Sequence, residues 1–136
     1  MGFSELRTAR SMAPHEDVEL IKTLTVHAHR AAKAGFEAIF PPDHQINGYM
    51  PIASDSYMFA AYLAGQLPDM HFGTSVTSVP LHHPVRFVER INILDQITDG
   101  KLLIGIGSGT TPEGMNGFGV HHKEAGAVSG RNPEIA

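Results

Sequence analysis

Apolar residues between positions 71 and 107 change from the pattern of a strand to that of a helix and back. Residues 71–79 are rich in β-branched side chains, which predicts a buried strand ending at Pro80. Pro84 is favoured at a first helical position, and apolar residues follow it at helical spacing up to Asp99 and Gly100. Residues 101–107 predict the next strand. Because no hairpin signal separates the two strands, they are expected to be parallel.

The same pattern occurs once earlier in the chain. Residues 14–34 predict a helix that ends at Gly35, and residues 36–40 predict a short strand. After a polar loop, residues 54–67 predict a second helix. The apolar stripe of the first helix is formed by Val18, Ile21, Leu24, Ala28 and Ala31 or Ala32, and the inner face of the second by Tyr57, Ala60, Ala61 and Ala64. The strands begin roughly 30–35 residues apart, which is typical of repeated βα units.

The predicted fold class is therefore α/β, with parallel strands near 36–40, 71–79 and 101–107 that could form a small parallel sheet or the front half of a (β/α)8 TIM barrel. A closed barrel of this kind needs about 250 residues, whereas this chain has 136. Residues around Phe3 to Leu6 give a weak signal for one more strand. We expect residues 1–120 to form the amino-terminal half of the barrel and the polar segment 121–136 to be loosely ordered.

Composition narrows the class of protein. A hydrophobic content of 42% is sufficient for a core, and a net charge of −4 provides no basic surface for nucleic acid or an anionic membrane. The sequence has no run of transmembrane length and no secretory signal pattern, so a cytoplasmic location is expected. With no cysteine, disulfides, thiolate nucleophiles and cysteine metal sites are excluded.

Parallel βα units place ligands at the carboxyl ends of their strands, which here are followed by residues 41–45, 77–80 and 107–111. His44 is the main candidate for catalysis, since an imidazole exchanges a proton near neutral pH and Asp43 could fix its tautomer or stabilise its cation. The alternative is a solvated loop histidine beside a turn aspartate.

Residues 105–109 offer a second candidate site. Their glycines would let backbone N–H groups and the Ser108 hydroxyl approach a phosphate or a ring, or would simply let two strands pack closely. Gly114, Gly117 and Gly119 argue against a regular helix behind them, so the dinucleotide-binding fingerprint is incomplete. No metal site is expected, because the histidine pairs lack ligand spacing, and neither Ser78 nor Ser108 has the setting of a catalytic serine.

Several segments, in this order, resemble the bacterial luciferase-like flavin-dependent oxidoreductases. They are Ala34 to Phe40 with Asp43 and His44, Phe72 to Val76, Pro80 to Arg86, Leu94 to Leu102, Gly105 to Gly109, and Phe118 to Val120. The resemblance covers roughly residues 17 to 120, and the ordered combination is more specific than any single motif.

The resemblance implies a (β/α)8 barrel whose strand ends bind flavin mononucleotide (FMN) or a deazaflavin coenzyme. His44 matches the active-site histidine beside the flavin ring. The other implied cofactor-binding residues are Asp43, Ser75, Val76, Thr77, Gly107, Ser108 and Gly109, with a non-prolyl cis peptide between Ser75 and Val76. Gln45 replaces a frequent second histidine and Ser108 a frequent arginine, so both cofactors stay open.

The implied activity is monooxygenation, in which reduced flavin and oxygen oxidise a small organic substrate; with deazaflavin it becomes hydride transfer. A flavin reductase is a further expected partner. A second hypothesis is a truncated, non-catalytic half-barrel that acts as an assembly or flavin-binding module, as a homo-oligomer or with a partner that supplies the missing half. A third is a small nucleotide-binding αβ domain that uses Gly105 to Gly109.

Overall fold

The computed structural model describes residues 3–5, 14–45, 55–109 and 112–121 of the chain. Four parallel strands form one sheet in the order β1-β2-β3-β4: β1 (Phe3–Glu5), β2 (Ala38–Phe40), β3 (His71–Ser78) and β4 (Leu102–Gly107). Each strand pairs with the next along the chain. The weak signal near Phe3 is therefore confirmed as a strand, and the three stronger strand predictions are confirmed with slightly shorter bounds.

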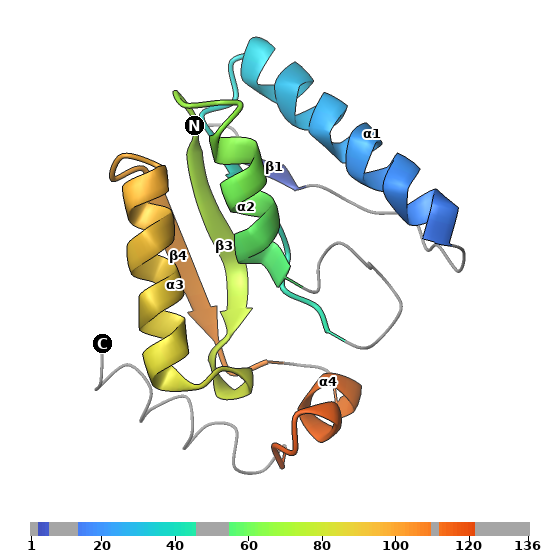
Figure 1. Ribbon diagram of the computed structural model, residues 1–136, viewed down its shortest axis with the longest axis vertical. Helices are drawn as coiled ribbons and strands as arrows, with labels where there is room; N and C mark the ends of the chain where they lie inside the picture. Colours follow the sequence, from blue (N-terminus) through green and yellow to red (C-terminus); the bar gives the residue numbers. More distant parts are fainter. Residues whose placement is uncertain (1–2, 6–13, 46–54, 110–111, 122–136) are drawn as a thin grey trace.

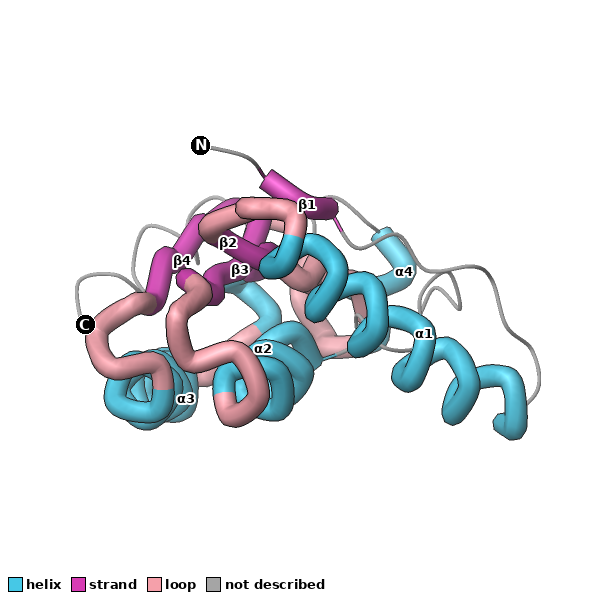
Figure 2. The backbone as a smooth tube through the Cα atoms, turned by 90° about the horizontal axis from the view of Figure 1, so that it is seen from above, coloured by secondary structure: helices cyan, strands magenta, loops and turns pink. Residues whose placement is uncertain are grey.

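Three helices connect the strands and lie on one side of the sheet, as the two views show: α1 (Pro14–Lys33), α2 (Ser56–Ala64) and α3 (Pro84–Ile97) (Figures 1 and 2). A short 3-10 helix, η2 (Val79–Leu81), follows β3. This βα arrangement is the one that the alternating periodicities predict. The helix side is called the helix-covered face below, and the other side the open face.

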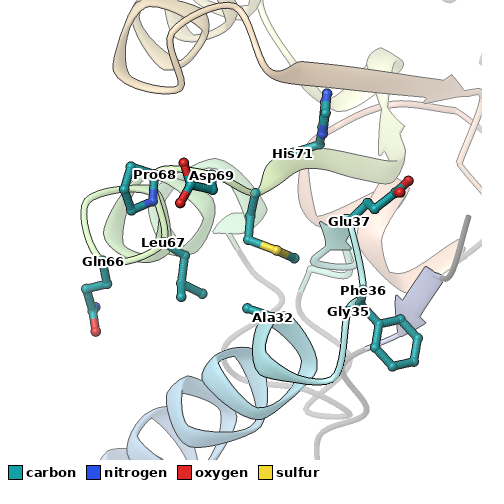
Figure 3. Close-up of a pocket in the computed structure, with 10 residues that line it drawn as sticks. Ala32, Gly35, Phe36, Glu37, Gln66, Leu67, Pro68, Asp69 and His71 are labelled. Atoms are coloured by element: carbon teal, nitrogen blue, oxygen red, sulfur yellow. The ribbon is translucent and has the colours of Figure 1, made fainter.

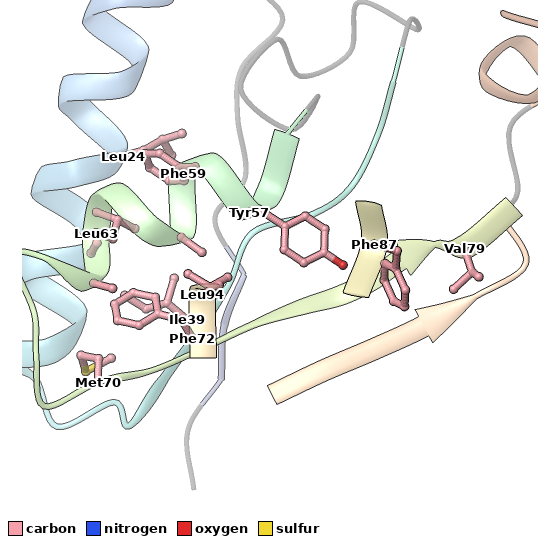
Figure 4. Close-up of a cluster of buried hydrophobic side chains, with 13 residues drawn as sticks. Leu24, Ile39, Tyr57, Phe59, Leu63, Met70, Phe72, Val79, Phe87 and Leu94 are labelled. Atoms are coloured by element: carbon pink, nitrogen blue, oxygen red, sulfur yellow. The ribbon is translucent and has the colours of Figure 1, made fainter. Parts of the chain in front are cut away.

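The hydrophobic core lies between the sheet and the helices (Figure 4). Ile39 and Phe72 point into it from β2 and β3, and both are almost completely buried. Leu24, Leu63 and Leu94 supply one buried side chain from each of the three helices. Burying apolar side chains of this size stabilises a fold by about 1.5–3 kcal/mol each, so these contacts hold the helices on the sheet.

Two of the predicted apolar faces extend further than the core. On α1, Leu24, Ala28 and Ala31 are buried, but Val18 and Ile21 are exposed, because the first turns of the helix extend past the sheet (Figure 2). On α3, Phe87 and Leu94 are buried, whereas Val85 and Ile97, which belong to the apolar spacing predicted after Pro84, are exposed.

The bounds of α2 differ from the prediction because of a cap. The Asp55 carboxylate accepts a hydrogen bond from the Met58 backbone N–H at 3.0 Å, so the helix begins at Ser56 rather than near Ser54. Tyr57, Ala60 and Ala64 are buried as predicted, and Ala61 is half-buried.

The expectation that glycines prevent a helix after residue 109 is wrong. A six-residue helix, α4 (Pro112–Gly117), occupies this segment and begins with a proline, the residue favoured at a first helical position. Met115 is buried. The prediction of a loosely ordered tail from 121 lies, apart from His121, outside the described residues.

Candidate functional site

Asp43 links the loop after β2 to the end of β3. Its carboxylate accepts hydrogen bonds from the Gln45 side-chain amide at 2.5 Å and from the Ser78 backbone N–H at 3.0 Å. The His82 Nε2 atom lies 3.5 Å from the same carboxylate, and only 1% of the Asp43 side chain is exposed. A buried carboxylate is stable only with such partners, so this contact fixes the two loops to each other.

Asp43 does not act on His44 as the sequence suggested. Among the described residues, its contacts are with Gln45, Ser78 and His82, and no hydrogen bond or ion pair joins it to the His44 ring. His44 is half-buried between two buried neighbours. Asp43 therefore fixes the backbone next to His44. A proton-transfer role for His44 stays a prediction.

Ser75 and Val76 lie at an irregularity near the carboxyl end of β3. The register with β4 shifts between Thr74 and Thr77, and the Ser75–Val76 peptide bond is cis, as the resemblance implied. Both side chains are exposed, Val76 by 45%. Whether they contact a cofactor stays a prediction.

The glycines of β4 allow Val76 to pack against that strand. A Cβ atom at Gly107 would lie 2.7 Å from Val76 Cγ2, and one at Gly105 would lie 2.6 Å from the Thr74 carbonyl oxygen. Any larger residue would displace Val76 or the strand. Close strand packing, one of the two roles considered for these glycines, is thus confirmed, and the predicted cofactor contact of Gly107 is untested.

Ser108 and Gly109 continue from β4 at the same edge. Ser108 is exposed. Gly109 has a φ of +79°, a conformation that favours glycine, and a Cβ there would lie 3.0 Å from Met115 Cε and 3.5 Å from the Ser78 side chain. The ends of β3 and β4 are thereby packed together, as Asp43 joins the ends of β2 and β3.

Thr77, another predicted cofactor-binding residue, faces the helices. Its hydroxyl is completely buried and lies 2.6 Å from the Tyr57 hydroxyl and 2.9 Å from the Thr74 hydroxyl. Burial raises the pKa of Tyr57 to about 12, so its hydroxyl is neutral at ordinary pH. The side chain of Thr77 thus supports the strand from the helix-covered face.

Sequence reasoning missed the roles of Gln45, Tyr57, Thr74 and His82. Their contacts join residues up to 39 positions apart in the sequence, as between Asp43 and His82. The packing of rings near these residues was not predicted either: the His82 ring lies edge-on to Tyr57 at 6.2 Å and tilted against Phe87 at 6.0 Å, measured between centroids. The only signal for these contacts in the sequence was a polar residue shortly after each of two parallel strands.

A pocket of about 610 Å³ lies at the opposite end of the sheet, where the strands begin (Figure 3). It is lined by the segments before β2 and β3, with Glu37, Asp69 and His71 among its polar residues. None of the predicted site residues lines it. In parallel βα folds the ligand binds at the carboxyl ends of the strands. We therefore assign the candidate site to this end of the sheet, with Asp43, Ser75, Val76 and Ser108.

The sequence model of the luciferase-like monooxygenases matches residues 3–129. The chain belongs to this family. A similar curated protein is the alkanal monooxygenase alpha chain of Photorhabdus laumondii, which is 28% identical over 95% of this chain and 36% of its own length. This chain therefore spans about a third of the length of such relatives.

Solved structures show the same fold at low sequence identity. Monooxygenase RslO1 from Streptomyces bottropensis superposes with a TM-score of 0.90 at 21% identity, over 99% of this chain and 41% of its own. The oxygenating constituent of 3,6-diketocamphane monooxygenase from Pseudomonas putida, in complex with FMN, gives 0.83 at 20% identity, over 94% and 35%. The coenzyme F420 dependent tetrahydromethanopterin reductase from Methanopyrus kandleri gives 0.60 at 22%, over 88% and 30%.

These comparisons confirm the predicted family and fold class: the sheet and its helices form part of a luciferase-like TIM barrel. Within the described ranges, no helix has both the length and the apolar character needed to cross a membrane.

Proposed function

We propose that this chain is the amino-terminal part of a flavin-dependent oxidoreductase in which reduced FMN and oxygen oxidise a small organic substrate. The observation that supports this most is that exposed Ser75, Val76 and Ser108 lie toward the carboxyl ends of β3 and β4, where Asp43 joins the loop after β2 to the end of β3. A flavin reductase would supply the reduced cofactor, and the βα units beyond this chain would complete the site.

The residues at this edge fit a planar ring. On the open face Val76 and Leu103 are 45% and 43% exposed, while Gly105 and Gly107 of β4 carry no side chain. This leaves a partly apolar surface, with the Ser75 and Ser108 hydroxyls as polar groups beside it. The packing of Gly107 against Val76 keeps that surface in place.

A bound flavin would supply the electron transfer. The contribution of this chain is to position and to move protons. His44 would exchange a proton with the substrate, since the two imidazole nitrogens can donate and accept a proton. Asp43, held by Gln45 and Ser78, would keep the His44 backbone at the edge of the sheet.

A deazaflavin coenzyme is the alternative cofactor. The likeness in fold to the coenzyme F420 dependent reductase supports this alternative, and the residues described here would serve either ring. In that case the reaction would be a hydride transfer without oxygen, with the same proton role for His44. Anaerobic titrations with each cofactor distinguish the two.

The first test is the visible absorption spectrum of the purified chain after incubation with excess FMN and removal of unbound cofactor. We expect a flavin spectrum. A colourless protein would contradict flavin binding by this chain.

The second test concerns His44. With reduced FMN, oxygen and an aldehyde substrate, His44→Ala should lower turnover about 100-fold or more, because general acid–base catalysis contributes that much. His71→Ala is the matched control, since His71 is exposed at the opposite edge and lines the pocket there. Unchanged turnover in His44→Ala would remove His44 from the mechanism.

A second candidate function is a non-catalytic half-barrel that assembles with another copy or with a partner. It is favoured by the exposed apolar side chains of Val76 and Leu103 on the open face, because such surfaces bind partners. Light scattering together with the turnover assay decides between the two. A stable dimer without turnover would favour the assembly module, and a monodisperse monomer would contradict it.

A further inference from the structure

The Ser75–Val76 segment of the candidate site lies at a break in the strand ladder. Thr74 pairs with Ile104 and Thr77 with Ile106, so two residues of β3 lie opposite one residue of β4, Gly105. Such a bulge interrupts the regular ladder and leaves the extra residue unpaired. Another set of contacts must fix the segment if it is to present a defined surface.

A chain of buried hydroxyl groups supplies these contacts from the helix-covered face. Thr74 Oγ1 donates to the Gly105 carbonyl oxygen at 3.0 Å, and Thr77 Oγ1 donates to Thr74 Oγ1 at 2.9 Å. The Tyr57 hydroxyl, on α2, lies 2.6 Å from Thr77 Oγ1. Thr74 and Thr77 flank the segment on both sides, and all three side chains are buried.

The direction of this chain follows from counting protons. Each hydroxyl has one hydrogen to donate, and the Gly105 carbonyl has none. Thr74 uses its hydrogen on the carbonyl and Thr77 uses its hydrogen on Thr74. The remaining bond must therefore be donated by Tyr57. The raised pKa of Tyr57 is consistent with this, because the group keeps its proton at working pH.

From this arrangement we infer that Tyr57 is a positioning residue: it anchors the chain of hydroxyls that fixes Ser75 and Val76 at the flavin-binding edge. Tyr57 itself lies on the helix-covered face and would not touch the cofactor. Its effect passes through Thr77 and Thr74, and it couples the position of α2 to the shape of the site. The expected effect on flavin binding rests on the proposed function. The positioning of Ser75 and Val76 rests on the hydrogen bonds alone.

The test compares Tyr57→Phe with Tyr62→Phe, which removes a hydroxyl from an exposed position on the same helix. We expect Tyr57→Phe to weaken FMN binding about tenfold, equivalent to about 1.4 kcal/mol, and Tyr62→Phe to bind as the wild type does. Thr77→Val should weaken binding similarly, and Thr77→Ser, which keeps the hydroxyl, should restore it. The double variant with Tyr57→Phe and Thr77→Val should lose little more than either single variant.

Amide hydrogen exchange is the second readout and does not depend on flavin. Tyr57→Phe should speed exchange at residues 75–77 by more than at β2 or α3. Unchanged FMN affinity with unchanged exchange would overturn the inference, and so would equally faster exchange throughout the sheet, which would show a general loss of stability. If the wild-type chain binds no FMN, the proposed function fails, and the exchange result alone supports or overturns the positioning role.

Discussion

The two ends of the sheet differ in how their polar residues are held. At the carboxyl end, Asp43, Gln45, Ser78 and Thr77 are buried and hydrogen-bonded to residues of other elements. At the amino end, Asp69 and His71 are exposed beside an open pocket. Burying polar groups costs free energy unless they are paired, so a fold keeps them where their position matters. The difference supports our proposal that the carboxyl end is the functional one, although the pocket lies at the amino end.

The largest effect is expected for Asp43→Ala. This change removes the acceptor of the Ser78 N–H and the Gln45 amide, both buried, and the neighbour of His82. Leaving buried donors unsatisfied costs about 1–3 kcal/mol each, so with two donors we expect a loss of about 2–6 kcal/mol in the free energy of unfolding. Urea denaturation measures it.

Asp69→Ala is the matched control at the amino end. An exposed substitution there should change stability by no more than about 0.5 kcal/mol. Equal losses in the two variants would remove the contrast between the two ends.

The second prediction concerns high pH. Because the pKa of Tyr57 is raised to about 12 from 10.0, the neutral phenol stabilises the fold. Its contribution is complete below pH 10 and is lost as the pH rises toward 12, with a limit of about 2–3 kcal/mol. The difference in stability between wild type and Tyr57→Phe should therefore shrink over this range, as followed by urea denaturation at each pH.

The same measurement on Tyr62→Phe is the control, since Tyr62 is exposed on the same helix. A difference between wild type and Tyr57→Phe that stays constant from pH 9 to 12 would contradict the burial of a neutral Tyr57 hydroxyl.

The third prediction uses the glycines. In Gly107→Ala the new methyl group would lie 2.7 Å from Val76 Cγ2, and we expect a loss of about 1–2 kcal/mol together with weaker FMN binding. Gly65→Ala, near the amino end of the sheet, has a φ of −65° and no atom closer than 4.0 Å, so it should be close to neutral. Thermal unfolding and FMN titration of both variants check this, and a Gly107→Ala variant with wild-type affinity would separate Val76 from the site.

The elements could be predicted from the sequence because their periodicity is local. Gly35 marks the end of one helix and Pro84 the beginning of another, so the order of strands and helices could be predicted directly. The bounds were less accurate, because a single cap such as Asp55 decides where a helix starts. Exposed Val18 and Val85 show that an apolar stripe does not tell how far the sheet beneath it extends.

The site was predictable only in part. That the ends of β2, β3 and β4 converge follows from parallel pairing, and the resemblance implied the cis bond between Ser75 and Val76. The partner of Asp43 could not be read from neighbouring positions, since its long-range contacts depend on how two loops pack. The sequence favoured His44 because it is adjacent, whereas the structure places His82 beside the carboxylate.

The most direct test of the account is a residue-by-residue map of FMN binding on the isotope-labelled chain by nuclear magnetic resonance. The account predicts that the amide signals of Ser75, Val76 and Ser108 shift on addition of FMN, while those of Glu37, Asp69 and His71 stay in place. Shifts confined to the amino-terminal pocket, or no shifts at saturating FMN, would contradict the claim that the carboxyl end of this sheet binds the flavin.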